Sequence, residues 1–249
     1  MSTDGSESRA TRDIPRAQDQ LFGAGGGARA KYSALIVGKP GWGALLKHEL
    51  VVLFAQPTPG ALGLALRKTL YPLLLGSCGR NVIFGQNVVL RHPHKIHIGD
   101  NVVIDDHVLL DAKGDANAGI RIGHRVFVGR NTILSCKNGD IELGDGANIG
   151  FNCEVFSASR VTIGKDTLVA AYAYLIGGDH DAPDPSRAVI AQERRSAGIR
   201  VGAGVWIGAG AKILDGVSIG DRGVIGAGAV VRADVPAGAT AVGVPARLL

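Results

Sequence analysis

Aliphatic residues recur at every sixth position along the last quarter of the chain, and glycine directly follows most of them. The repeat runs without a gap through Val201, Ile207, Ile213, Ile219, Ile225 and Val231. A second small or β-branched residue follows four positions after each, from Val205 to Val235. Neither a helical period nor simple alternation explains this spacing. Short strands joined by tight corners do explain it, because glycine tolerates the positive φ angles of a sharp turn. The pattern predicts coils of three short strands, stacked as a parallel β-helix around an aliphatic column.

The same frame extends backwards with interruptions. It continues through Phe84, Leu90, Ile98, Ile104, Leu110, Ile122, Val128, Leu134, Leu143, Ile149, Val155, Ile163, Val169 and Leu175, which gives about seven coils. Six residues are added between Leu110 and Ile122, three between Leu134 and Leu143, and twenty between Leu175 and Val201. Loops on a rigid repeat are the usual place for binding and catalytic residues. The longest insertion is therefore the first place to look for a functional site.

Composition agrees with a narrow β-helix and excludes some partners. Apolar residues make up 46% of the 249 residues, but aromatic residues only 5%, and glycine occurs 37 times. The net charge is +5, but the basic residues are dispersed and no aromatic platform accompanies them, so no nucleic-acid partner is expected. Cys78, Cys136 and Cys153 show neither metal nor redox spacing, which indicates a reducing cytosol. Cys153 falls on an inward position of the repeat, where it is expected to pack in the core.

The N-terminal third lacks the repeat. Residues 1–30 are polar and glycine-rich and read as a disordered tail and linker, without the apolar core of a signal peptide. Residues 31–80 are expected to form a helical extension, and residues 81–249 the β-helix domain.

Two apolar stretches within the extension have helical spacing. In Trp42 to Phe54, one face would carry Leu45, Leu46, Leu50 and Leu53, and the remaining face Lys47, His48 and Glu49. In Ala61 to Leu75, one side would carry Leu62, Leu66, Leu70, Leu73 and Leu74, with Arg67 and Lys68 breaking the run. Neither stretch is long enough to span a membrane. Two interpretations remain, a helical cap on the β-helix and a pair of interfacial helices that contacts the membrane through residues 42–75.

The repeat and the C-terminal sequence together resemble a known family. The motifs are Val205-Trp206-Ile207-Gly208-Ala209-Gly210-Ala211, Val224-Ile225-Gly226-Ala227-Gly228-Ala229, Asp234-Val235-Pro236 and Gly243-Val244-Pro245-Ala246-Arg247. They resemble the hexapeptide-repeat acetyltransferases, in the branch of galactoside, maltose and polysaccharide O-acetyltransferases. The resemblance covers roughly residues 82 to 249. It implies a left-handed β-helix, a homotrimer with active sites between subunits, and acetyl-CoA as donor.

The resemblance also implies a catalytic residue. His180 follows Gly177-Gly178-Asp179 at the start of the longest insertion, where the family places a histidine that acts as general base. An imidazole with a pKa near 6.5 can accept a proton from an attacking hydroxyl near neutral pH. Asp179, Asp181 and Glu154 are the candidates for orienting the ring, and the choice among them stays open.

The acceptor and donor sites follow by the same resemblance. Asn152, Asp181 and Tyr174 are the candidates for binding the acceptor, while Ala158 replaces an acidic residue with which some relatives hold sugar. For the donor, the matching positions are Ala209, Ala227, Arg232, Arg247 and Trp206. The small residues would admit the pantetheine arm and the arginines would bind phosphate. The relatives' lysine after Arg232 is Ala233 here. Trp206 is more consistent with packing than with adenine stacking.

Histidines elsewhere raise a metal alternative. His92, His94 and His97 cluster, and His107 precedes His124 by nearly one coil, as in a carbonic anhydrase of this architecture. The His-Gly pair of that family is missing after His124, so no metal is expected. The predicted function is acetyl-CoA-dependent O-acetylation of a saccharide, such as a polysaccharide or lipid-linked precursor, in the cytoplasm or at the inner face of the membrane. The alternatives are another acyl donor or an amine acceptor, and a non-catalytic β-helix that binds a partner.

Overall fold

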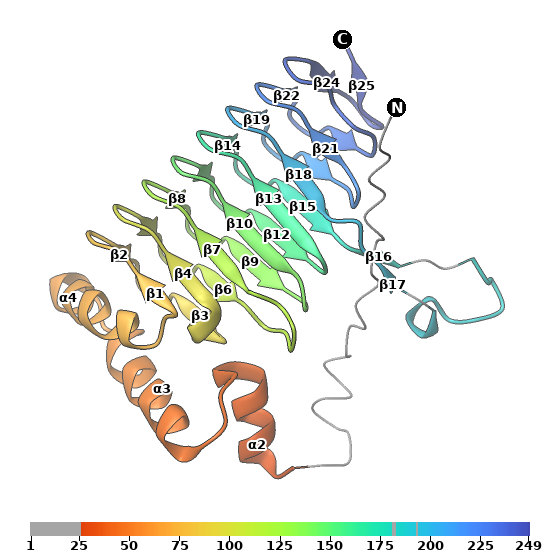
Figure 1. Ribbon diagram of the computed structural model, residues 1–249. Coiled ribbons are helices and arrows are strands. Elements are labelled where there is room, and N and C mark those ends of the chain that lie inside the picture. The colour runs from red at the N-terminus through yellow and green to blue at the C-terminus, as the bar shows by residue number, and fades with distance from the viewer. Residues whose placement is uncertain (1–25, 181–182, 193) are drawn as a thin grey trace, which may run out of the picture.

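The chain folds into a three-sided prism of parallel strands with helices at its N-terminal end (Figure 1). The computed structural model describes residues 26–180, 183–192 and 194–249. The predicted tail therefore lies almost wholly outside the described residues.

Each side of the prism is one sheet whose strands come from successive coils and run parallel, except that β25 pairs antiparallel with β24 at the end of the second sheet. The first sheet contains β1 (Ser77–Cys78), β4 (Ile96–Ile98), β7 (Ile120–Ile122), β10 (Asp140–Leu143), β13 (Arg160–Ile163), β18 (Ile199–Val201) and β21 (Ser218–Ile219). The second contains β2 (Ile83–Phe84), β5 (Val103–Ile104), β8 (Phe127–Val128), β11 (Asn148–Ile149), β14 (Leu168–Val169), β19 (Trp206–Ile207), β22 (Val224–Ile225), β24 (Thr240–Val242) and β25 (Arg247–Leu248). The third contains β3 (Val89–Arg91), β6 (Leu109–Asp111), β9 (Ile133–Cys136), β12 (Glu154–Ser157), β15 (Tyr174–Gly177), β20 (Lys212–Ile213) and β23 (Val230–Val231). Seven three-stranded coils and a partial eighth result, as the period predicts.

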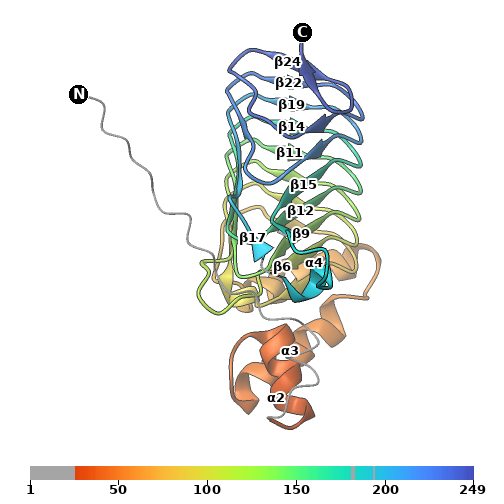
Figure 2. The same cartoon turned by 90° about the vertical axis from the view of Figure 1, so that its right-hand side faces the viewer.

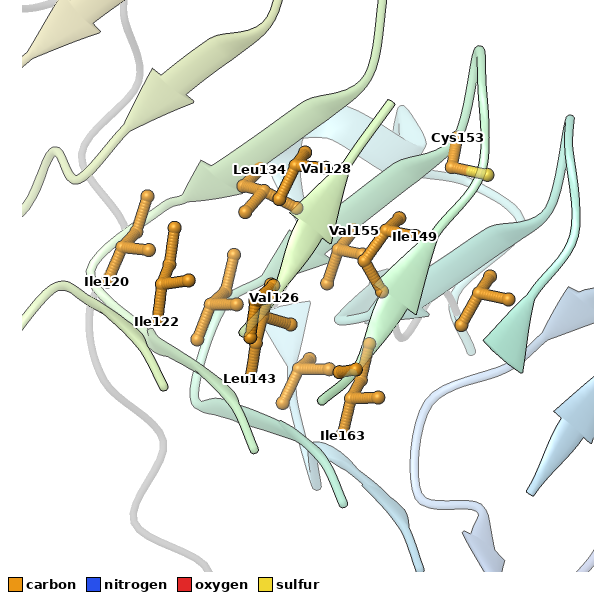
Figure 3. Close-up of a cluster of buried hydrophobic side chains, with 14 of the residues drawn as sticks. Ile120, Ile122, Val126, Val128, Leu134, Leu143, Ile149, Cys153, Val155 and Ile163 are labelled. Carbon is orange, nitrogen blue, oxygen red and sulfur yellow. The ribbon is translucent and has the colours of Figure 1, made fainter. Parts of the chain in front are cut away.

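The aliphatic column lies where the six-residue period places it. Every frame residue from Phe84 to Val231 is buried. Frame residues of successive coils stand in register, as Leu143 does with Ile163 and Ile163 with Val201. Figure 3 shows these side chains pointing into the prism from all three sheets. Cys153 is also buried, in the packing role expected of it.

Irregular segments collect along one edge of the prism, the edge that follows the third sheet. We call it the loop edge, and it comprises residues 92–95, 112–119, 137–139, 158–159, 178–180, 183–192 and 194–198. Successive coils are hydrogen-bonded there, as by the Asn138 N–H to the Lys113 carbonyl (3.1 Å) and the Ala158 N–H to the Gly177 carbonyl (2.8 Å). The three insertions seen in the sequence therefore lie above one another on the same edge.

Helices cover the open end of the first coil. They are α2 (Ala28–Tyr32), the π-helix η1 (Ser33–Val37), α3 (Trp42–Ala55), α4 (Gly60–Leu70) and the 3₁₀ turn η2 (Tyr71–Leu73). Two further 3₁₀ turns lie in the loop edge, η3 (Pro93–Lys95) and η4 (Val189–Ala191). The Tyr71 ring packs edge-on against Phe84 of the first coil at 5.2 Å, and its hydroxyl donates to the Val88 carbonyl. No helix within the described ranges is both long enough and apolar enough to cross a bilayer.

The structure shows which face of each long helix packs against the prism, a point that the sequence left open. In α3 the face that contains His48, Val51 and Ala55 is buried, so the lysine–histidine–glutamate segment does not form an exposed polar face as a whole. The predicted apolar face points outward, with Leu46, Leu50 and Leu53 all exposed. In α4 and the η2 turn after it, Arg67 is buried while Leu62 and Leu73 are exposed, although Leu66, Leu70 and the following Leu74 do face the core. Helical spacing shows which residues share a face, but not which face meets the prism.

Candidate active site

The longest insertion leaves the prism after β15 and begins as a small antiparallel hairpin. Its strands are β16 (Asp179–His180) and β17 (Arg194–Arg195), and His180 pairs with Arg194 across it. Figures 1 and 2 show this segment projecting from an otherwise regular prism. His180 is thus presented at the base of the only large excursion within the described part of the chain.

A group of hydrogen bonds anchors the returning end of the excursion to the prism. The Ser196 hydroxyl donates to the Gly177 carbonyl (2.9 Å) and lies 2.8 Å from the Ser159 hydroxyl oxygen. The Asp215 carboxylate accepts the N–H groups of Ala197 (2.7 Å) and Gly198 (2.8 Å). Both ends of the hairpin are therefore fixed to neighbouring coils, which limits where His180 can lie.

His180 itself is exposed, as is its neighbour Asp179. The Asp179 carboxylate accepts the backbone N–H of His180 (2.7 Å), so this contact shapes the backbone, and no hydrogen bond engages the imidazole nitrogens among the residues that the structure describes. Asp181, the second candidate for orienting the ring, lies outside the described residues. Arg194 is the functional candidate that sequence reasoning missed. Arg194 pairs with His180 inside an insertion that lacks the six-residue repeat. The two consecutive basic residues Arg194 and Arg195 were the only sequence signal for it.

Glu154 and Tyr174 form a second group at the opposite edge of the third sheet. They are register partners on β12 and β15. Burial raises the pKa of the Glu154 carboxyl, and burial together with the Glu154 charge raises the pKa of the Tyr174 hydroxyl. Three residues of strand, about 10 Å, separate this group from the loop edge. One protomer therefore does not bring Glu154 to the His180 imidazole.

Asn152 belongs to the same distant corner. It adopts a left-handed conformation with φ of 53°, and its side-chain oxygen accepts the Asn131 amide of the preceding coil (3.2 Å). An asparagine tolerates this backbone geometry better than most residues. These contacts give Asn152 a corner-forming role in the protomer, beside any contact with an acceptor.

The donor candidates line the upper part of that corner, between the second and third sheets. The Gly228 N–H donates to the Ala209 carbonyl (2.8 Å), which stacks Ala209 directly below Ala227. Gly210 and Gly228 have φ of +69° and +68°, and a Cβ on either would meet no neighbour. We call this strip of Ala209, Gly210, Ala227 and Gly228 the small-residue corner. It leaves backbone groups open to an extended ligand.

The remaining donor candidates are exposed. Arg232 follows β23, and Arg247 lies on β25, where its Nη1 donates to the Ala246 carbonyl (3.3 Å). The Trp206 side chain lies outward on the second sheet, beside Leu168 in register, with 54% of its surface exposed. It is therefore not part of the core.

The clustered histidines are engaged in other contacts. His92 Nε2 lies 2.7 Å from the Ala34 carbonyl oxygen, His97 Nδ1 lies 2.9 Å from the Ser77 hydroxyl, and His124 Nδ1 accepts the Asp100 N–H. No group of three or more potential metal ligands comes together among the residues that the structure describes.

Comparisons with known proteins agree with this architecture. Residues 198–233 match the family model described as bacterial transferase hexapeptide (six repeats). The repeat that predicted the fold therefore matches this family model over residues 198–233, and the prism is a left-handed parallel β-helix. No curated protein matches the chain significantly.

The chain is similar to solved structures of several acyltransferases. AntD, an N-acyltransferase from Bacillus cereus in complex with dTDP and 3-hydroxybutyryl-CoA, is 23% identical, with a TM-score of 0.53 over 74% of this chain and 86% of that one. A maltose O-acetyltransferase from Clostridium difficile 630 is 23% identical, with a TM-score of 0.45 over 82% and 83% of the two chains. The polySia-specific acetyltransferase NeuO is 26% identical, with a TM-score of 0.49 over 69% and 79%.

Proposed function

We propose that the protein is an acetyl-CoA-dependent O-acetyltransferase that acts on a hydroxyl of a saccharide, such as a polysaccharide or lipid-linked precursor. The observation that carries this proposal is the placement of His180. A prism with a transferase-type hexapeptide repeat carries a long, anchored excursion, and that excursion begins with an exposed His180 imidazole that has no hydrogen bond among the described residues. A structural β-helix that only binds a partner would not require this feature.

The chemistry needs a base and no covalent intermediate. The neutral His180 imidazole removes the proton from the acceptor hydroxyl while its oxygen attacks the thioester carbonyl. A C–O bond forms and the tetrahedral oxyanion is met by backbone N–H groups of the coil corners. Collapse breaks the C–S bond, and the proton passes from His180 to the departing thiolate, giving the acetyl ester and CoA.

A homotrimer would complete this site. Within one protomer, His180 lies at the loop edge and the small-residue corner lies across the third sheet. Active sites between subunits would join the loop edge of one protomer to the corner of the next. Ala209 and Ala227 would then line the pantetheine groove, with Arg232 and Arg247 at the phosphates. Glu154, Asn152 and Tyr174 would reach the acceptor or the His180 ring from the neighbouring copy.

An amine acceptor or a longer acyl donor is the second candidate function. It is favoured by the likeness to AntD, which is described as an N-acyltransferase and holds 3-hydroxybutyryl-CoA. General-base catalysis by His180 serves an amine as well as a hydroxyl, so the same site supports both reactions.

The outer face of α3 supports the location proposed for the enzyme, in the cytoplasm at the inner face of the membrane. Its exposed side chains fall at helical spacing on one stripe, with Arg29 stacked over the first of them at 4.2 Å. We call them the α3 stripe: Trp42, Leu46, Leu50, Leu53 and Phe54. An apolar stripe with basic neighbours is typical of helices that lie in a membrane interface. Through it, the enzyme would remain near lipid-linked acceptors.

One experiment tests the reaction and its base together. Purified protein is mixed with acetyl-CoA or 3-hydroxybutyryl-CoA and a panel of sugars, nucleotide sugars and lipid-linked glycans, and thiol release is measured. His180→Asn should lower the rate about 10²–10⁴-fold while the oligomeric state stays unchanged. His124→Asn, a matched change of an exposed histidine at the corner between the first and second sheets, should retain full activity. A His180→Asn variant that keeps most of its turnover contradicts the proposal.

A further inference from the structure

A cavity of about 300 Å³ lies at the loop edge, between α2 and the corners of the second and third coils. Its polar lining residues are Lys31, His92, Lys113, Asp115, Lys137 and Asn138. Nothing in the hexapeptide repeat accounts for this cavity, because one wall is formed by the N-terminal helices.

The charge of the cavity is strongly positive. Three lysines line it against one carboxylate, that of Asp115, whose charge also acts on the nearby Lys95. Among the described residues, no ion pair engages Lys113 or Lys137. Burial, followed by the charges of Arg194 and Lys113, lowers the pKa of Lys137. The positive charges of Arg194 and Lys113 thus disfavour the charged form of Lys137, and a bound anion would offset this effect.

The walls of the cavity are held in place by hydrogen bonds. The Asn138 side-chain oxygen accepts the N–H groups of Asp115 and Ala116, each at 3.1 Å. Lys95 Nζ donates to the Gly114 carbonyl and to the Asn117 side chain. His92, with 6% of its surface exposed, lies 2.7 Å from the Ala34 carbonyl through Nε2, while its buried Nδ1 has no hydrogen-bond partner in the described part of the chain. A preformed pocket binds its ligand without paying for reorganisation.

Lys137 lies on the same edge of the prism as the hairpin that contains His180. The Lys137 N–H donates to the Ser157 carbonyl (2.7 Å), and the next coil continues from Ala158 to Gly177, so Lys137 lies two coils below the base of the hairpin. At the spacing of β-strands this is about 10 Å. Arg194 is linked to both sites: its charge contributes to the lowered pKa of Lys137, and its backbone pairs with His180 across the hairpin. A sugar at His180 would thus place an attached phosphate near the lysines.

We propose that this cavity binds a phosphate or diphosphate group of the acceptor, so that the enzyme acetylates a phosphorylated sugar in preference to a neutral one. The inference rests on the proposed function and narrows its substrate class. Lys113 and Lys137 supply the charge and Asn138 shapes the wall, while Arg194 directs the sugar towards His180. Lysine ammonium groups bind phosphate as point charges, which suits a pocket that must accept either a lipid-linked or a nucleotide-linked diphosphate.

Binding is tested with the full chain and inorganic pyrophosphate, by isothermal titration calorimetry at two salt concentrations. The double variant Lys113→Gln/Lys137→Gln should bind pyrophosphate at least 10-fold more weakly than the wild type. Lys165→Gln, an exposed lysine on another edge, should bind as the wild type does. Circular dichroism melts verify that all variants are folded. Equal affinities of the double variant and the wild type, or no binding by the wild type, overturn the proposal.

Acyl transfer supplies the second readout and separates the sources of phosphate. The ratio of kcat/KM for a polyprenyl-diphosphate sugar and for a nucleotide-diphosphate sugar, each over the free sugar, is compared between variants. The double variant Lys113→Gln/Lys137→Gln should lower at least one of these two kcat/KM ratios 10-fold. The ratio that falls identifies the natural carrier of the sugar. Lysine-dependent pyrophosphate binding without any acyl transfer would refute the proposed reaction alone. Active enzyme with unchanged ratios would refute the cavity proposal alone.

Discussion

The Arg67 guanidinium is buried at the junction between the helices and the first coil. Its Nε donates to the Phe84 carbonyl (2.9 Å), and Nη1 donates to the carbonyls of Ala55 (3.0 Å) and Thr58 (2.6 Å). Ala55 ends α3, where helix carbonyls lack intrahelical partners. One side chain thus satisfies three carbonyls and links α3, α4 and β2. A Cβ on Gly63 would overlap the Thr58 carbonyl, so glycine permits this close approach.

Replacing Arg67 with methionine should destabilise the helical cap. Methionine fills much of the space but donates no hydrogen bond, so the three carbonyls lose their partner, at a cost of about 3 kcal/mol. Urea unfolding followed by Trp42 fluorescence, in a Trp206→Phe background, measures the change. Lys68→Met, an exposed substitution on the same helix, should leave the midpoint almost unaltered. Equal midpoints for the two variants would show that the Arg67 hydrogen bonds make no net contribution to the free energy of unfolding.

At the scale of elements, sequence reasoning succeeded where the pattern repeats. The hexad predicted the strands that contain the frame residues from Phe84 to Val231, because each coil imposes the same steric demand on its inward positions, whereas β1 and β24 lie outside that frame. Helical spacing also predicted α3, but it did not indicate which face of the helix meets the prism. The end of a narrow prism admits the face with Val51 and Ala55, whose side chains are small, and His48 reaches Glu49 there (3.1 Å). The hairpin that pairs His180 with Arg194 was unpredictable, since antiparallel pairing inside a single insertion carries no period.

The exposed α3 stripe should bind membranes. Wild-type protein is expected to float with vesicles that contain phosphatidylglycerol, because apolar burial and basic neighbours act together. The triple variant Leu46→Ser/Leu50→Ser/Leu53→Ser should remain at the bottom of the gradient. Val244→Ser/Leu248→Ser removes exposed apolar side chains at the opposite end of the molecule and should float normally (Figure 1). If the triple variant floats like wild type, or changes the oligomeric state instead, the stripe has another partner.

At the scale of the whole molecule, the prism is a stack in which each coil contacts only its neighbours. Such stacks can break into independently unfolding segments where a repeat is interrupted. The twenty-residue insertion does not interrupt the hydrogen bonding, because β13, β14 and β15 pair directly with β18, β19 and β20. The chain leaves the column at the loop edge and returns to the next register position. The stack, including its helical cap, should therefore unfold as one unit.

A cavity in the coil below the insertion tests this continuity. Ile163, with 1% of its surface exposed, stacks between Leu143 and Val201, so Ile163→Ala should cost about 3 kcal/mol. In single-tryptophan variants, Trp206 reports on the coil above the insertion and Trp42 on the helices below the prism. Both probes should show the same lowered midpoint at equal protein concentration. Outward-facing Thr162→Ala should lower the free energy of unfolding by less than about 1 kcal/mol. A shift seen only by Trp206 would mean that the cap unfolds separately, and a shift seen only by Trp42 that the insertion divides the stack.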